Sequence, residues 1–145
     1  MPFMWGDTLE ALERAHLLRL VVWGAASILA GTALVALLMS KHRHSPLLKH
    51  FGFQCVGWGI VEVALGAVLI SQVAPRDLSA ATRLDRLLWL NIGLDAGFII
   101  SGAMFAIVGW RLVRSLGSVG AGIGIVLHGM ALAVLDLVLA SQISR

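Results

Sequence analysis

The sequence has little of what polar chemistry or a covalent framework requires. Only 13% of its 145 residues are charged, about half of the roughly 25% that is typical of soluble domains. The single cysteine, Cys55, excludes an intramolecular disulfide and a metal site framed by cysteines. The chain also lacks a phosphate-binding loop and the Gly-x-Ser-x-Gly and His-Glu-x-x-His signatures of hydrolases. No catalytic residues are therefore predicted, and an enzyme is the less favoured class.

Long apolar runs dominate what is present. Hydrophobic residues make up 59% of the chain, and a soluble domain of this size could not bury so much apolar surface. Four runs are each long enough to cross a bilayer as a helix: residues 20–39, 51–74, 87–110 and 116–140. We therefore predict an all-α integral membrane protein, folded as an antiparallel four-helix bundle in a single domain over residues 1–145.

The basic residues lie at the ends of these runs, which favours membrane lipids as partners and argues against nucleic acid. The side that holds the first and third connections carries five Lys and Arg, against six on the other side. That count does not decide the orientation. Because the first side has no acids, we expect it to be cytoplasmic, with both termini outside the plasma (inner) membrane. His42 and His44 could begin a metal site there, but no further ligands follow, so a basic headgroup loop is the favoured interpretation.

The two halves of the sequence resemble each other. The second and fourth runs match at an offset of 70, as in Gly52 with Gly122 and Gly59 with Gly129. The pattern indicates two tandem two-helix repeats, residues 7–74 and 79–145, in the same orientation about an axis along the membrane normal. Chance similarity is the alternative, because membrane spans use few residue types.

Polar side chains inside the runs are the candidate functional residues. Ionisable groups at bilayer depth are costly and usually pair inside a bundle. The set consists of Gln54, Glu62, Asn91, Asp95, His128 and Asp136. A rise of about 1.5 Å per residue puts Glu62 and His128 both near the midplane. We therefore predict that these two side chains meet, at the inner end of a polar line that starts at the outer face.

Small residues at helical spacing predict close helix packing. The positions are Gly93, Gly97, Ser101, Gly120 and Gly124. The first three share one face of the third run, and Asn91 and Asp95 lie roughly opposite. A helix with a small-residue face and a polar face should touch protein on both sides, so we expect the third run at the centre of the bundle.

Three functions remain open from the sequence. Favoured is a non-enzymatic accessory or scaffold subunit that packs through small-residue faces, as a homo-oligomer or in a larger membrane complex, with the buried polar groups as hydrogen-bonding glue. The first alternative is a proton- or cation-linked transporter or channel that uses Glu62, Asp95, His128 and Asp136. The second is binding of a lipophilic cofactor or pigment near His128; the sequence identifies no such cofactor, and haem finds no second histidine at matching depth.

Overall fold

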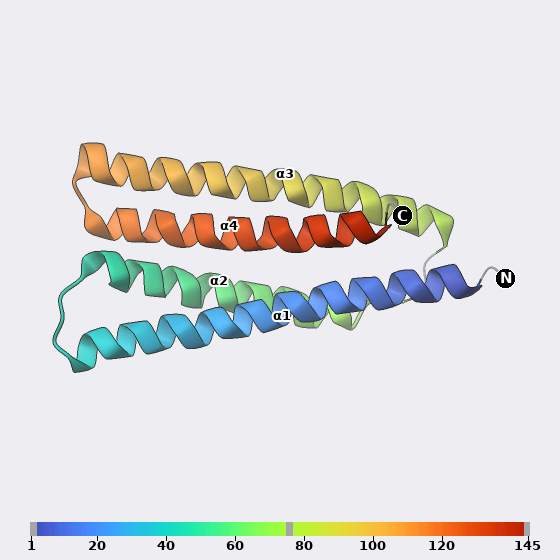
Figure 1. Ribbon diagram of the computed structural model, residues 1–145, viewed down its shortest axis with the longest axis horizontal. Helices are drawn as coiled ribbons and strands as arrows, with labels where there is room; N and C mark the ends of the chain where they lie inside the picture. Colours follow the sequence, from blue (N-terminus) through green and yellow to red (C-terminus); the bar gives the residue numbers. More distant parts are fainter. Residues whose placement is uncertain (1–2, 75–76, 144–145) are drawn as a thin grey trace.

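The computed structural model describes residues 3–74 and 77–143, nearly all of which are helical (Figure 1). The helices are α1 (Phe3–Ser40), α2 (Pro46–Ile70), α3 (Leu78–Val108), a π-helical turn η1 (Gly109–Val113) that continues α3, and α4 (Leu116–Ile143). Within these described residues, four helices are long and apolar enough to cross a membrane. The predicted all-helical, antiparallel four-helix architecture is therefore confirmed.

The start of α2 is set by local capping, five residues before the predicted run. The Ser45 side chain accepts a hydrogen bond from the Leu48 N–H at 3.4 Å, and Pro46 occupies the first helical position. Proline suits that position because its missing N–H would have no partner in the helix. The helix ends at Ile70, four residues before the predicted end of the run, so α2 is shifted toward the N-terminus rather than shortened.

Asp77 starts α3 in the same way. Its carboxylate accepts hydrogen bonds from the Ala80 N–H at 2.7 Å and from the Ser79 hydroxyl at 2.9 Å. These two bonds stabilise the charged form and hold the pKa of the Asp77 carboxyl below its usual value. The helix therefore begins well before the apolar run at residue 87, and its first turns form the lead-in to the span.

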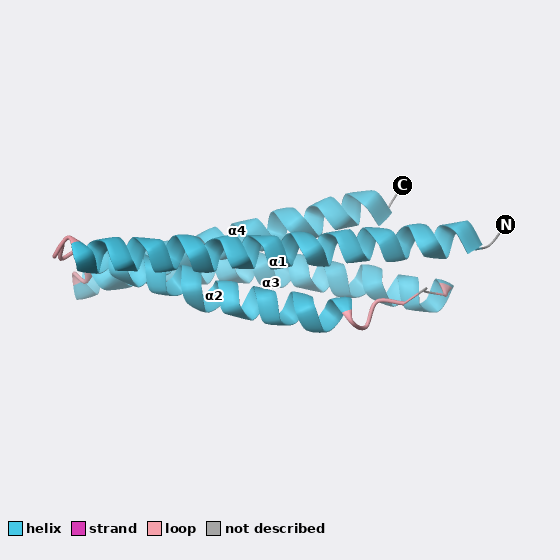
Figure 2. Ribbon diagram, turned by 90° about the horizontal axis from the view of Figure 1, so that it is seen from below, coloured by secondary structure: helices cyan, strands magenta, loops and turns pink. Residues whose placement is uncertain are grey.

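The helices alternate in direction and form two hairpins, α1 with α2 and α3 with α4 (Figures 1 and 2). The termini and the α2–α3 connection lie at one end of the bundle, here called the terminal end; the α1–α2 and α3–α4 connections lie at the other, the loop end. The hairpins meet mainly along α2 and α4. The expectation that the third run is central is therefore wrong. Instead, α3 packs along α4 and reaches α2 through the Phe98 ring against Trp58.

Glycine lets the helix backbones approach within each hairpin. A Cβ added at Gly31 of α1 would lie 2.6 Å from the Gly52 carbonyl oxygen of α2. One added at Gly102 of α3 would lie 2.9 Å from the Gly122 carbonyl oxygen of α4. Both distances are shorter than carbon–oxygen contacts allow, so any other residue would push the helices apart.

These contacts correspond between the hairpins. Gly102 follows Gly31 by 71 residues, and Gly122 follows Gly52 by 70. The same offsets relate a second contact: Gly59 faces the Ile28 backbone, and Gly129 faces the Ile99 backbone. Two hairpins with matching glycine contacts and the same orientation are what a tandem repeat would produce, although the duplication itself stays a prediction.

Candidate functional site

Glu62 of α2 and His128 of α4 are hydrogen-bonded to each other where the two hairpins meet. The distance from Glu62 Oε1 to His128 Nδ1 is 2.7 Å. Glu62 is 2% exposed and His128 is 1% exposed. Their equal depth in the second and fourth runs predicted this meeting, and the structure brings them together. We call these two residues the central pair.

Glycines make room for the central pair. On α2, Gly59 and Gly66 lie one turn before and after Glu62 and are buried with it. A Cβ added at Gly24 of α1 would lie 3.0 Å from the Glu62 Cβ, so α1 closes over that side chain. On α4, Gly124 precedes His128 by one turn and packs against α2. Close helix approach on both sides excludes lipid from the pair.

Aromatic rings from two other helices contact His128, and a third ring packs behind one of them. The Trp58 ring of α2 stacks on the imidazole, with centroids 6.5 Å apart and planes at 27°. The Trp23 ring of α1 meets it edge-on at 5.9 Å and 62°, and Phe98 of α3 packs against Trp58 at 5.1 Å. Spacing by four residues places Trp58 on the face of Glu62, whereas nothing in the sequence separated Trp23 from tryptophans at the membrane interface.

The chemistry open to the central pair is to hold and exchange a proton. A carboxyl and an imidazole joined by one hydrogen bond can share a proton, as either a neutral pair or a compact ion pair. Among the described residues, neither Glu62 Oε2 nor His128 Nε2 has a hydrogen-bond partner. These two atoms are therefore the places where a further proton or a polar ligand could bind.

A second cluster lies between the central pair and the terminal end. His16 Nε2 of α1 is 3.3 Å from Asp136 Oδ1 of α4. Asp95 of α3 is buried and close enough to Asp136 to interact with it electrostatically. The terminal-end cluster is defined here as His16, Asp95 and Asp136. Sequence reasoning found both acids but missed His16, because the first span was predicted to start at residue 20, whereas α1 is one helix from Phe3 onward.

The predicted polar line is interrupted. Asp136 follows His128 by eight residues on α4, which separates the two by about 12 Å along the helix. Asn91 is exposed on α3, and Gln54 is half-buried with its Cβ side against Gly124. Neither amide is hydrogen-bonded to the central pair. The other candidate residues form two separate groups, the central pair and the terminal-end cluster, and the two amides lie outside both.

The predicted packing glycines divide into two groups. Gly120 and Gly124 pack tightly against α2, facing the Leu47 backbone and the Gln54 side chain. A Cβ added at Gly93 or Gly97 would have nothing within 4 Å, and Ser101 is exposed. Among the described residues nothing packs against this face of α3 at Gly93 and Gly97, so its role in packing against a partner stays a prediction.

The geometry also bears on metal and cofactor binding. No group of three His, Cys, Asp or Glu side chains within residues 3–74 and 77–143 could hold a metal ion. An apolar groove of about 330 Å³ lies between α1 and α4, lined by Trp23, Leu127, Met130, Ala131, Val134 and Leu135. His128 does not line this groove, so a lipophilic group bound there would contact Trp23 and not the imidazole.

Comparison with known proteins places the chain in a family. No curated protein and no solved structure gives a significant match. A family model matches residues 19–137, a segment that contains the central pair, Asp95 and Asp136 but begins after His16. Because this match covers most of the chain, the protein belongs to that family, which is described as a family of unknown function (DUF6992).

Proposed function

We propose that this chain is a small multi-pass protein of the plasma (inner) membrane that binds protons at the central pair and couples this binding to the movement of protons or a small cation. The observation that carries the proposal is the 2.7 Å hydrogen bond between Glu62 and His128, both almost fully buried. Ionisable residues inside a membrane span are costly and commonly mark ion or proton routes. If the pair only held the helices together by a hydrogen bond, uncharged amides could do the same at a lower free-energy cost of burial.

Access from one end supports this reading. His16, Asp95 and Asp136 lie between the central pair and the terminal end, so proton carriers are present on that side. Toward the loop end, α4 packs on α2 through Gly120 and Gly124. A coupled cycle would therefore receive protons from the terminal end and would open the α2–α4 contact toward the loop end.

The distribution of charged residues supports an orientation of the protein in the membrane with the loop end facing the cytoplasm. The loop end carries Lys41, Arg43, Lys49, Arg111 and Arg114, in the connections and the adjoining helix turns, and no acidic residue. The terminal end mixes basic residues with acids. A purely basic end fits the anionic cytoplasmic leaflet best, which would put both termini on the outer side.

The test is a flux measurement on purified protein in liposomes that contain a pH-sensitive dye. We expect a proton flux driven by a potential or by a cation gradient in the wild type, and its loss in Glu62→Gln. Asp85→Asn, a carboxyl-to-amide change at a half-buried position near the terminal end, is the matched control and should keep the flux. Wild-type liposomes no leakier than empty ones, or full flux in Glu62→Gln, would reject the proposal.

A second candidate is the accessory or scaffold role, favoured by the unused face of α3. Gly93 and Gly97 have open space where a Cβ would lie, and small residues one turn apart allow close helix association in a membrane. Cross-linking after gentle solubilisation should then recover a dimer or a larger complex that Gly97→Leu abolishes. The control is Gly57→Leu, at a glycine of α2 that is equally open.

A further inference from the structure

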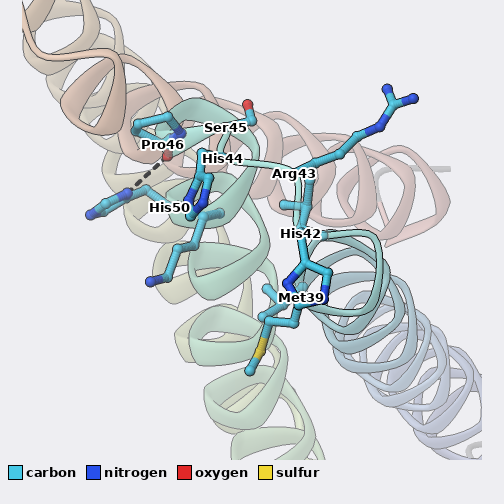
Figure 3. Close-up of a pocket in the computed structure, with 10 residues that line it drawn as sticks. Met39, His42, Arg43, His44, Ser45, Pro46 and His50 are labelled. Carbon is cyan, nitrogen blue, oxygen red and sulfur yellow. Dashed lines mark hydrogen bonds between the residues drawn. The ribbon is translucent and has the colours of Figure 1, made fainter.

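We propose that a cleft at the loop end binds the headgroup of one anionic phospholipid. The cleft has a volume of about 450 Å³ and lies between the end of α1 and the start of α2 (Figure 3). Its polar lining includes His42, Arg43, His44, Lys49 and His50. No acidic side chain lines it. This site is remote from the central pair, and the proposal does not depend on proton-linked function.

The cleft is amphipathic in the way a phospholipid is. Val35, Leu38 and Met39 lie on one face of the last turns of α1 and form the apolar part of the lining. The histidines and the two cations come from residues 42–50, at the end of the membrane-spanning segment. Apolar walls next to the span and cationic walls beyond it match the first acyl carbons and the phosphate of a lipid at the interface.

The cationic side chains have no acidic partner. Arg43 and Lys49 are exposed, and neither forms an ion pair with another residue among those the structure describes. Lys49 Nζ lies 5.7 Å from the centre of the Phe53 ring, a weak contact that leaves its donors free. No Asp or Glu occurs in the sequence between Glu13 and Glu62. The charge that complements this cleft must therefore come from outside the chain, as basic pockets beside spans take it from anionic lipids.

Several contacts fix the walls before any lipid binds. His50 Nδ1 lies 2.8 Å from the Pro46 carbonyl oxygen, and because a carbonyl oxygen only accepts, Nδ1 carries the hydrogen. The same ring packs edge-on against Phe53 and on Gly117 of α4. His42 adopts a left-handed backbone (φ 48°), which turns the chain back over α1. In Figure 3, His42 lies by the end of α1 and His44 between α1 and α2, the His50 ring is directed to the Pro46 carbonyl, and the Arg43 side chain extends from the rim.

A phospholipid fits better than free phosphate. Inorganic phosphate would use the basic rim and leave the apolar walls from α1 without a partner. A zwitterionic lipid would fill the apolar part but would also bring its own cationic group to a cleft whose two charged side chains, Arg43 and Lys49, are both cationic. An anionic phospholipid, such as phosphatidylglycerol, satisfies both parts.

Native mass spectrometry of the purified full chain can test this. The protein is released from mixed micelles that contain equal amounts of phosphatidylglycerol and phosphatidylcholine of the same acyl length, and the retained lipids are counted. We expect the wild type to retain one phosphatidylglycerol with a preference on the order of tenfold, the effect of one to two basic residues at an anionic headgroup. The double variant Arg43→Gln/Lys49→Gln should lose that preference.

The control is Arg83→Gln/Arg86→Gln, which removes the same charge from exposed positions near the terminal end and should keep the preference. Unfolding midpoints in phosphatidylcholine micelles will check that each variant is folded. Equal retention of the two lipids by the wild type would overturn the proposal, as would equal loss in both double variants. Displacement of the lipid by excess inorganic phosphate would show that the cleft recognises the anion alone, and would also overturn it.

Discussion

Trp58 and His128 stack on each other, with ring centroids 6.5 Å apart, and they occupy corresponding positions in the two hairpins, since His128 follows Trp58 by 70 residues. If the two hairpins are repeats, as the sequence predicts, corresponding residues meet only near the pseudo-symmetry axis, and that axis would pass between α2 and α4. Glu62 corresponds at the same offset to Leu132. The carboxyl of the central pair therefore has no counterpart at this offset, and the pair would be a departure from the predicted repeat.

The first prediction concerns the coupling between Glu62 and His128. A double-mutant cycle with Glu62→Gln and His128→Gln should give a coupling of about 1–2 kcal/mol in the free energy of unfolding, the upper part of the range for hydrogen bonds inside membranes. Reversible unfolding in mixed micelles provides the measurement. A coupling below about 0.3 kcal/mol, the usual additivity error for separate sites, would mean that the two side chains do not interact.

A single substitution gives a second check on the same site. Glu62→Leu should lower the free energy of unfolding more than Gln54→Leu does. The reason is that it leaves the buried Nδ1 of His128 without its partner, whereas Gln54 is half-buried and makes no hydrogen bond to the central pair. The same unfolding assay measures both. Equal losses would mean that the carboxyl acts only by filling space.

The third prediction concerns the terminal-end cluster. Asp136→Asn removes the carboxylate that lies 3.3 Å from His16 Nε2, and we expect it to lower the free energy of unfolding by about 1 kcal/mol. Asp85→Asn, which touches neither cluster, should change it little. His16→Gln combined with Asp136→Asn should cost less than the sum of the two single changes. Strict additivity would contradict the pairing.

Glycine substitutions should separate packed from open positions. Gly124→Leu places a large side chain where a Cβ would already lie 2.5 Å from the Gln54 Cβ, so it should destabilise the monomer by about 1–3 kcal/mol, as overpacking does. Gly97→Leu and Gly57→Leu fill open space and should leave monomer stability nearly unchanged. Destabilisation of the monomer by Gly97→Leu would show that α3 packs differently within the chain.

Asp77 predicts a pH dependence at the start of α3. The N–H of Ala80 and the Ser79 hydroxyl hold the pKa of the Asp77 carboxyl below its usual value of 3.8. A lowered pKa means that the cap contributes stability above the usual value and loses it as the pH falls through the lower, folded-state value. Thermal unfolding at neutral and at acidic pH should therefore show that Asp77→Ala destabilises the protein at neutral pH and matches the wild type in acid.

Asp77→Asn is the control for that experiment, because asparagine still caps a helix but does not titrate. It should retain most of the cap at both pH values. A constant difference between the wild type and Asp77→Ala across the acid range would contradict the assigned role of the charge.

Topology can be tested by cysteine labelling in intact membranes. With Cys55 replaced by alanine, single cysteines at His44 and Ser115 should react with an impermeant maleimide from one side, because both connections lie at the loop end. A cysteine at Gln72 should react from the opposite side. Labelling of His44→Cys and Gln72→Cys from the same side would reject the four-span arrangement.

Much of the fold could be predicted from the hydrophobic runs and the capping residues of the sequence. Four apolar runs of bilayer length determine the number of helices, and their alternating direction follows because each successive span crosses the membrane in the opposite direction. Pro46 and Asp77 mark helix starts because capping acts within one turn. The depth of Glu62 and His128 along their runs also follows from the helical rise. Their hydrogen bond could therefore be predicted once the second and fourth runs were taken as neighbours.

Tertiary packing decided what local signals do not encode. The sequence shows that Gly93 and Gly97 share one helical face. Small residues permit close approach but do not specify which helix approaches, so only the assembled bundle shows that α4 packs on Gly102 instead. The His16–Asp136 contact joins residues 120 positions apart, and no periodicity within one helix relates them. The sequence by itself determined which helices form and where their polar groups lie along the bundle; which of these groups meet was decided by glycine contacts between helices, because those contacts set each helix's rotation against its neighbours.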